Sequence, residues 1–122
     1  MTKPLALIVE DHPMLRTFFA EALQEANYQT EVAQDGNEAL NKLGKLIPDL
    51  VLLDLHLPHI SGEDILTAIR IDCRLKETKV IVTSVDGSWA SFLENKADLV
   101  LTKPVGYKQL QRLASRMHPN TP

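Results

Sequence analysis

Four short runs of apolar residues interrupt the chain at wide intervals, and none of them alternates with polar residues. They cover residues 5–9, 50–53, 80–82 and 99–101. A continuous apolar run of this length is typical of a strand buried on both faces, as in a parallel sheet covered by helices. A fifth run, residues 28–33, alternates polar and apolar side chains and predicts an edge strand. The sequence therefore predicts a sheet of five strands.

The segments between these runs have the spacing of amphipathic helices, with apolar side chains at intervals of three and four. Their apolar positions are Leu15, Phe18, Phe19, Ala22, Leu23 and Ala26; then Ala39, Leu40, Leu43 and Leu46; then Ile65, Leu66, Ile69 and Cys73; and finally Leu110, Leu113, Ala114 and Met117. A further short helix is predicted over residues 88–95. This alternation of strands and helices predicts right-handed crossovers and a doubly wound α/β fold, with helices on both faces of a parallel sheet.

Length, charge and cysteine content narrow the class of protein. The 122 residues predict one domain, residues 1–122, with a core at about 5–117 and residues 118–122 as a tail or linker stub. A net charge of −3 argues against direct binding of nucleic acid, which requires clustered cations. No apolar run approaches the roughly 20 residues of a membrane span. The single cysteine, Cys73, has no intramolecular partner, so we interpret it as structural and expect a reducing cytoplasm.

Charged residues directly follow three of the predicted strands. Glu10 and Asp11 follow the strand predicted at residues 5–9, and Asp54 follows the one at 50–53. Lys103 lies just beyond the strand predicted at 99–101. In a doubly wound sheet the ligand site lies outside the carboxyl ends of the strands, so these side chains are expected to meet there. Three carboxylates placed together repel one another unless a cation is supplied, and hard oxygen ligands suit Mg²⁺. The sequence therefore predicts a magnesium site, with Lys103 as a second positive charge.

The order and spacing of these motifs resemble the receiver domains of two-component response regulators. The resemblance extends roughly from residue 5 to residue 117. It rests on Leu7-Ile8-Val9-Glu10-Asp11-His12-Pro13, on Val51-Leu52-Leu53-Asp54-Leu55-His56-Leu57-Pro58 with Ser61-Gly62, on Val80-Ile81-Val82-Thr83-Ser84, and on Leu101-Thr102-Lys103-Pro104. It implies a flavodoxin-like sheet with strand order 2-1-3-4-5. It also implies a cis peptide before Pro104, a geometry that proline favours.

The resemblance implies that Asp54 accepts a phosphoryl group. The donor would be a phosphohistidine on a sensor histidine kinase or phosphotransfer protein, and Thr83 and Lys103 would bind phosphoryl oxygens. Catalysis would consist of positioning and charge neutralisation. Because the domain would turn over only its own phosphoryl group, we do not expect an enzyme in the usual sense. A downstream effector or output domain would read the switch, and the resemblance leaves a homodimer on activation open.

The resemblance also implies a set of magnesium ligands. Asp11 and Asp54 would bind the ion through their carboxylates, and Glu10 would hold it through water. The backbone carbonyl of His56 would be a further ligand. The side chain of His56, two residues beyond Asp54, is then placed to influence the access of water to the phosphoryl group.

The chain departs from the family pattern at three places. Val100 stands where an aromatic residue is usual, three positions before Lys103, which weakens the common coupling between the phosphoryl site and the output surface. Ser84 stands where alanine is more usual. The segment between Thr83 and Lys103 is also short, so its helix is expected to be abbreviated, with Trp89 and Phe92 as its packing residues.

Three other functions are compatible with parts of this pattern. A phosphatase of the haloacid dehalogenase type requires Asp-x-Asp, but this chain has Asp54-Leu55-His56 and lacks the second carboxylate. A flavodoxin-like phosphate binder needs a loop rich in glycine or hydroxyl groups after the first strand, where Glu10 and Asp11 would repel a phosphate. A protein-interaction module that signals without obligatory phosphorylation stays open, because Val100 and the short helix favour it.

Overall fold

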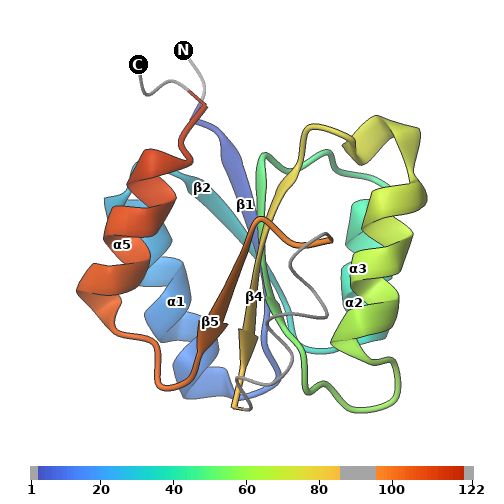
Figure 1. Ribbon diagram of the computed structural model, residues 1–122, viewed down its shortest axis with the longest axis horizontal. Coiled ribbons are helices and arrows are strands. Elements are labelled where there is room, and N and C mark those ends of the chain that lie inside the picture. The colour runs from blue at the N-terminus through green and yellow to red at the C-terminus, as the bar shows by residue number, and fades with distance from the viewer. Residues whose placement is uncertain (1–2, 86–95, 120–122) are drawn as a thin grey trace.

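Five parallel strands form the centre of the molecule, in the order β2-β1-β3-β4-β5 (Figure 1). The computed structural model describes residues 3–85 and 96–119. Within these ranges the elements are β1 (Leu5–Val9), α1 (Pro13–Glu25), β2 (Gln29–Ala33), α2 (Gly36–Leu43), β3 (Leu50–Asp54), α3 (Gly62–Ile71), a 3₁₀ turn (Cys73–Leu75), β4 (Lys79–Ser84), β5 (Leu99–Thr102) and α5 (Tyr107–Arg116). The prediction of a doubly wound parallel sheet with this strand order is confirmed.

Two hydrophobic cores lie on opposite faces of the sheet. Helices α1 and α5 cover one face, and α2 and α3 cover the other (Figure 1). Successive residues of β1 alternate between the cores, since Leu7 packs with α2 and α3 whereas Ile8 packs with α1 and α5. Alternating side chains of a strand point to opposite faces, so a strand between two cores is apolar throughout. This packing explains the continuous apolar runs.

The helices begin close to the carboxyl ends of the strands. The side chain of Asp35 accepts a hydrogen bond from the Glu38 amide at 2.8 Å and caps α2, and Ser61 caps α3 in the same way. A side chain could not be added at Gly62, because its Cβ would collide with the backbone of Asp54 and Leu55. Gly62 therefore allows α3 to start directly against the end of β3.

At the opposite end of the sheet, two aspartates pair with residues near the start of neighbouring strands. The carboxylate of Asp49 accepts a hydrogen bond from the Leu5 amide at 2.9 Å, and the Asp49 amide donates to the Leu5 carbonyl at 2.8 Å. Asp98 makes the same pair of bonds with Val80, at 2.7 and 2.8 Å. We call this end of the sheet the amino edge, and the end where the strands finish the carboxyl edge.

Several local predictions need correction. Helix α2 ends at Leu43, so Leu46 lies beyond it, and Leu40 is exposed. Cys73 is also exposed, because α3 ends at Ile71 and Cys73 begins the following turn. The interpretation of Cys73 as a packing residue is therefore wrong.

The edge strand predicted over residues 28–33 also differs in detail. It does lie at an edge of the sheet, but β2 starts at Gln29 and its burial does not alternate. The predicted helix over 88–95, with Trp89 and Phe92, falls outside the ranges that the structure describes. Within those ranges, no helix combines the length and apolar character that crossing a membrane requires.

Candidate functional site

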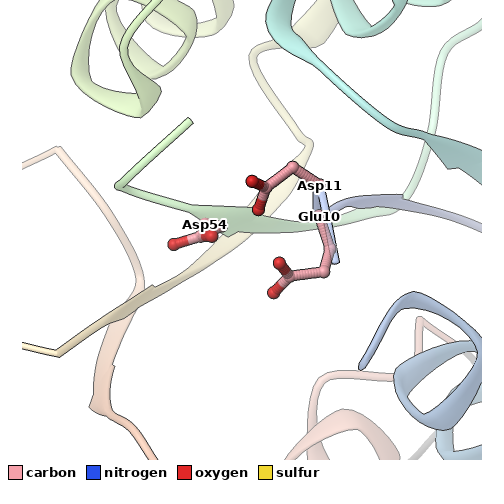
Figure 2. A group of neighbouring side chains, drawn as sticks. All are labelled: Glu10, Asp11 and Asp54. Atoms are coloured by element: carbon pink, nitrogen blue, oxygen red, sulfur yellow. The ribbon is translucent and has the colours of Figure 1, made fainter. Parts of the chain in front are cut away.

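Three carboxylates from two neighbouring strands meet at the carboxyl edge, as Figure 2 shows. Glu10 and Asp11 follow β1, and Asp54 is the last residue of β3. Because Val9 lies opposite Leu53 in the parallel pairing of β1 with β3, the residues that follow them are brought side by side. One oxygen from each carboxylate lies within 4.8 Å of the others. We call Glu10, Asp11 and Asp54 the acidic corner; the prediction that they meet is confirmed.

Lys103 reaches the acidic corner from the segment after β5. Its Nζ lies 3.2 Å from Glu10 Oε1 and 3.3 Å from Asp54 Oδ2. The Lys103 amide donates to the Ser84 carbonyl at 2.8 Å, and the Lys103–Pro104 peptide is cis, as the resemblance to receiver domains implied. The side chains of Glu10 and Asp54 are 2% and 3% exposed, so this ion pair lies largely out of water.

The pKa values at the site reflect burial first and the neighbouring charges second. Burial raises the pKa of Glu10, and the negative charge of Asp54 raises it further. A hydrogen bond from the His12 amide and the charge of Lys103 oppose this rise without cancelling it. Partial burial lowers the pKa of Lys103, but Asp54 and Glu10 outweigh it and leave that pKa above its usual value. Three carboxylates thus share one ammonium, and the corner favours further positive charge.

The donor set fits a hard divalent cation. All the side-chain ligand atoms of the acidic corner are carboxylate oxygens, and their mutual distances of 4.8 Å or less allow a single ion to contact them. Mg²⁺ prefers oxygen ligands and usually retains several waters, so a corner with a few carboxylates suits it. The exposed position of Asp11 leaves one side of the corner open to water.

Thr83 and His56 lie beside Asp54. In the pairing of β3 with β4, Asp54 is opposite Thr83, which is 1% exposed. The His56 amide donates to Asp54 Oδ1 at 3.1 Å, and the His56 ring nitrogen Nε2 lies 3.3 Å from the hydroxyl oxygen of Ser84. The side-chain contact between His56 and Ser84 was not predicted from the sequence.

Arg16 is a second residue that the sequence analysis missed. Its Nη1 donates to the carbonyl of Glu10 at 3.0 Å and to that of Asp11 at 3.4 Å, from the first turn of α1. It therefore holds the backbone that carries both carboxylates. The available signal was an arginine five residues after an acidic pair, on the helix that the pair precedes.

An apolar hollow of about 600 Å³ adjoins Lys103. Helix α1 forms one wall and the segment after β5 forms another; the lining residues are Met14, Leu15, Phe18, Phe19, Val85, Lys103, Pro104 and Val105. Met14 is 76% exposed and Val85 is 67% exposed, so the hollow presents apolar side chains to solvent beside Lys103.

Comparisons with known proteins agree with this geometry. The family model of the response regulator receiver domain matches residues 6–115. The sensor histidine kinase RcsC of Salmonella typhi is 33% identical over 109 residues, which cover 88% of this chain and 12% of that protein. The DNA-binding response regulator MtrA of Mycolicibacterium smegmatis is 33% identical over 115 residues, which cover 93% of this chain and 50% of that protein.

A solved structure has the same fold. The response regulator protein TrrA of Thermotoga maritima, in complex with Mg²⁺-BeF, superposes with a TM-score of 0.82 at 31% identity, over 96% of this chain and 99% of that chain. The parallel sheet and the acidic corner define the class as a signalling domain with a phosphoacceptor function. Since the family model matches most of its length, the chain belongs to the response regulator receiver domains of two-component systems. It spans half or less of RcsC and MtrA.

Proposed function

We propose that Asp54 accepts a phosphoryl group from a phosphohistidine in a Mg²⁺-dependent reaction, and that this modification switches the interaction of the domain with a downstream partner or output domain. The position of the Asp54 carboxylate carries the proposal. It is buried, it pairs with the ammonium of Lys103, and it adjoins the other two carboxylates of the acidic corner. A nucleophile in this setting is fixed in place and faces the positive charge that a phosphoryl group requires.

The residues around Asp54 have distinct tasks in the transfer. A carboxylate oxygen of Asp54 attacks phosphorus in line, and the bond from phosphorus to the donor imidazole nitrogen breaks with its electron pair left on that nitrogen. The Lys103 ammonium and the Thr83 hydroxyl pair with phosphoryl oxygens as the transferred group arrives. The product is an acylphosphate on Asp54. Hydrolysis later returns the carboxylate, so the domain is a switch that turns over only its own modification.

The magnesium ligands are proposed from the same residues. Asp11, Asp54 and the backbone carbonyl of His56 would hold the ion directly, and Glu10 would hold it through water. When bound, Mg²⁺ supplies the positive charge that offsets the carboxylates and the phosphoryl oxygens. Support comes from TrrA, which was solved with Mg²⁺-BeF at 31% identity to this chain.

The apolar hollow beside Lys103 suits the phosphodonor protein. A sensor histidine kinase or phosphotransfer protein in the cytoplasm would bring its phosphohistidine to Asp54, so part of its surface must lie next to the acidic corner. The hollow provides exposed apolar side chains at that place, with Met14 on α1 and Val85 after β4. We therefore assign the donor to this face, on the α1 side of Lys103.

A second function has one observation in its favour. Val100, which is partly buried on β5 against one of the cores, has no ring whose rotation could signal a change at Thr83. A protein-interaction module that does not depend on phosphorylation would not need such a ring. The acidic corner and its lysine are, however, complete, and a module of this kind does not require them. We therefore prefer the phosphoacceptor function.

Labelling by a small phosphodonor tests the proposal. With acetyl phosphate and Mg²⁺, the intact mass should increase by one phosphoryl group. Asp54→Asn or chelation of the metal should remove the adduct, since the amide is not a nucleophile of this kind. Asp49→Asn is the matched control, because it changes an aspartate at the amino edge and should leave labelling intact. Unchanged labelling of Asp54→Asn would contradict the assignment.

A further inference from the structure

Arg16 ties the start of α1 to the segment that carries two of the three carboxylates. Its Nη1 donates to the carbonyl oxygen of Glu10 at 3.0 Å and to that of Asp11 at 3.4 Å. The Arg16 amide donates to the His12 carbonyl at 2.9 Å, so the arginine is itself held in the first turn of the helix. Figure 2 shows that the side chains of Glu10 and Asp11 extend from this segment toward Asp54. Arg16 therefore reaches the acidic corner through the backbone.

The two residues that Arg16 contacts differ in how firmly the rest of the fold holds them. The Glu10 amide donates to the Ala33 carbonyl of β2 at 3.1 Å, and the Glu10 side chain is 2% exposed. Asp11 is exposed and lies where the chain leaves the sheet for α1. Conformational freedom at such a residue must be removed when a metal ion binds, which costs free energy. The hydrogen bond from Arg16 to the Asp11 carbonyl restricts this freedom before an ion arrives.

The charge of Arg16 acts in the opposite direction to its hydrogen bonds. The amino end of a helix favours negative charge, so a guanidinium in the first turn of α1 does not stabilise that helix. A cation close to the acidic corner also repels an incoming metal ion. Charge alone thus predicts that Arg16 weakens metal binding, whereas the fixing of the backbone predicts that Arg16 strengthens it.

We propose that Arg16 is a positioning residue for Mg²⁺, which sets the affinity of the acidic corner by fixing the backbone of Glu10 and Asp11. This inference rests on the proposed magnesium site. Residues that orient metal ligands without contacting the metal typically contribute about 10–100-fold to metal affinity. Because Arg16 acts through the main chain, we expect the lower end of this range, about tenfold.

Replacement of Arg16 by methionine tests the proposal. Arg16→Met keeps a long unbranched side chain and removes the hydrogen-bond donors of the guanidinium. Titration calorimetry of the full chain with MgCl₂, in the absence of a phosphodonor, should give a Kd about tenfold higher than that of wild type. Arg16→Lys retains an ammonium that can donate to a carbonyl, so its Kd should lie between those of Arg16→Met and wild type.

Arg116→Met is the matched control. Arg116 is the exposed last residue of α5, and this end of the helix lies by the amino edge, so the variant loses the same charge far from the acidic corner (Figure 1). Its Kd for Mg²⁺ should equal that of wild type. Urea unfolding without metal identifies the conditions in which each variant is folded, and the titrations are made there. If Arg16→Met does not fold, Arg16→Lys takes its place, and a wild-type Kd for Arg16→Lys would overturn the proposal.

The outcomes distinguish this inference from the proposed function. A wild-type Kd for Arg16→Met would overturn the inference, and so would tighter binding, which is the result expected if the guanidinium acts only through its charge. Equal weakening in Arg116→Met and Arg16→Met would overturn it as well. In each of these cases wild type still binds Mg²⁺, and the proposed magnesium site stands. A wild-type chain that binds no Mg²⁺ at millimolar concentration would overturn both the inference and that site.

Discussion

Carboxylates lie at both edges of the sheet, but their surroundings differ. At the amino edge, Asp49 and Asp98 each accept a backbone N–H from a neighbouring strand, and Asp98 also pairs with Arg70 at 3.0 Å. At the carboxyl edge, Glu10 and Asp54 also accept a backbone N–H each, from His12 and His56, but both carboxylates are almost fully buried and share the single ammonium of Lys103. The same type of side chain thus has sufficient donors at one edge and too little positive charge at the other.

This difference separates a structural role from a functional one. A carboxylate bonded to a backbone donor stabilises the fold, since its removal leaves that donor without an acceptor. Carboxylates crowded around one cation cost stability in the absence of a metal and gain it when an ion binds. Position at a strand end is therefore not sufficient evidence of function; the burial of the carboxylates and their crowding around one cation separate the two roles.

The largest effect on stability is expected at the amino edge. Asp98→Ala removes the acceptor of the buried Val80 amide and the partner of Arg70, so unfolding free energy should fall by about 1–3 kcal/mol. Urea unfolding without metal measures this loss. Asp98→Asn is the matched control, because it keeps an oxygen for Val80 and loses only two partly exposed ion pairs, with Arg70 and Lys79, each worth less than about 1 kcal/mol. Equal stability of wild type and Asp98→Ala would remove the contrast between the edges.

Magnesium should act only at the carboxyl edge. At a free concentration ten times its dissociation constant, Mg²⁺ should stabilise the wild type by about 1.4 kcal/mol, since it binds the folded state alone. Asp11→Asn should lose more of this gain than Glu10→Gln, because Asp11 is proposed to contact the ion directly whereas Glu10 is proposed to hold it through water. Asp49→Asn should retain the whole gain. Melting curves that do not respond to millimolar Mg²⁺ would count against the metal site.

Much of the fold was predictable because each apolar run packs against two cores. Every residue of strand β1 is apolar because alternate side chains pack into the cores on opposite faces of the sheet. Such a run indicates a parallel sheet that is covered by helices on both faces. The acidic corner was predictable for a related reason: parallel strands end at one edge, so the residues after them meet. The order of the strands did not follow from periodicity and came from the resemblance.

The errors occurred where a local signal competed with the periodic pattern. Cys73 continues the apolar spacing of α3, but Asp72 has an extended backbone and caps the next turn with its side chain, so the helix ends before Cys73. The role of Arg16 and the side-chain contact between His56 and Ser84 were missed for another reason. Their contacts depend on how side chains are directed across loops, which spacing along the chain does not specify.

The smallest expected effect tests the sign of the charge imbalance at Glu10. Because burial and Asp54 raise its pKa above the ordinary 4.5, the ionised carboxylate is less favourable in the folded chain than in the unfolded one. The contribution of the Glu10 carboxyl group to the free energy of unfolding is complete below pH 4.5. It is lost as the pH rises through the higher pKa that this group has in the folded chain.

The variant Glu10→Gln does not titrate, keeps an oxygen for the His12 amide and leaves Lys103 paired with Asp54. Without metal, this variant should therefore be more stable than wild type at pH 7, and the difference should shrink at pH 4. Urea unfolding in a chelating buffer at both pH values measures it. A variant that is less stable than wild type at pH 7 would show that Lys103 already balances the corner, and the contrast between the two edges would then be one of position and not of charge.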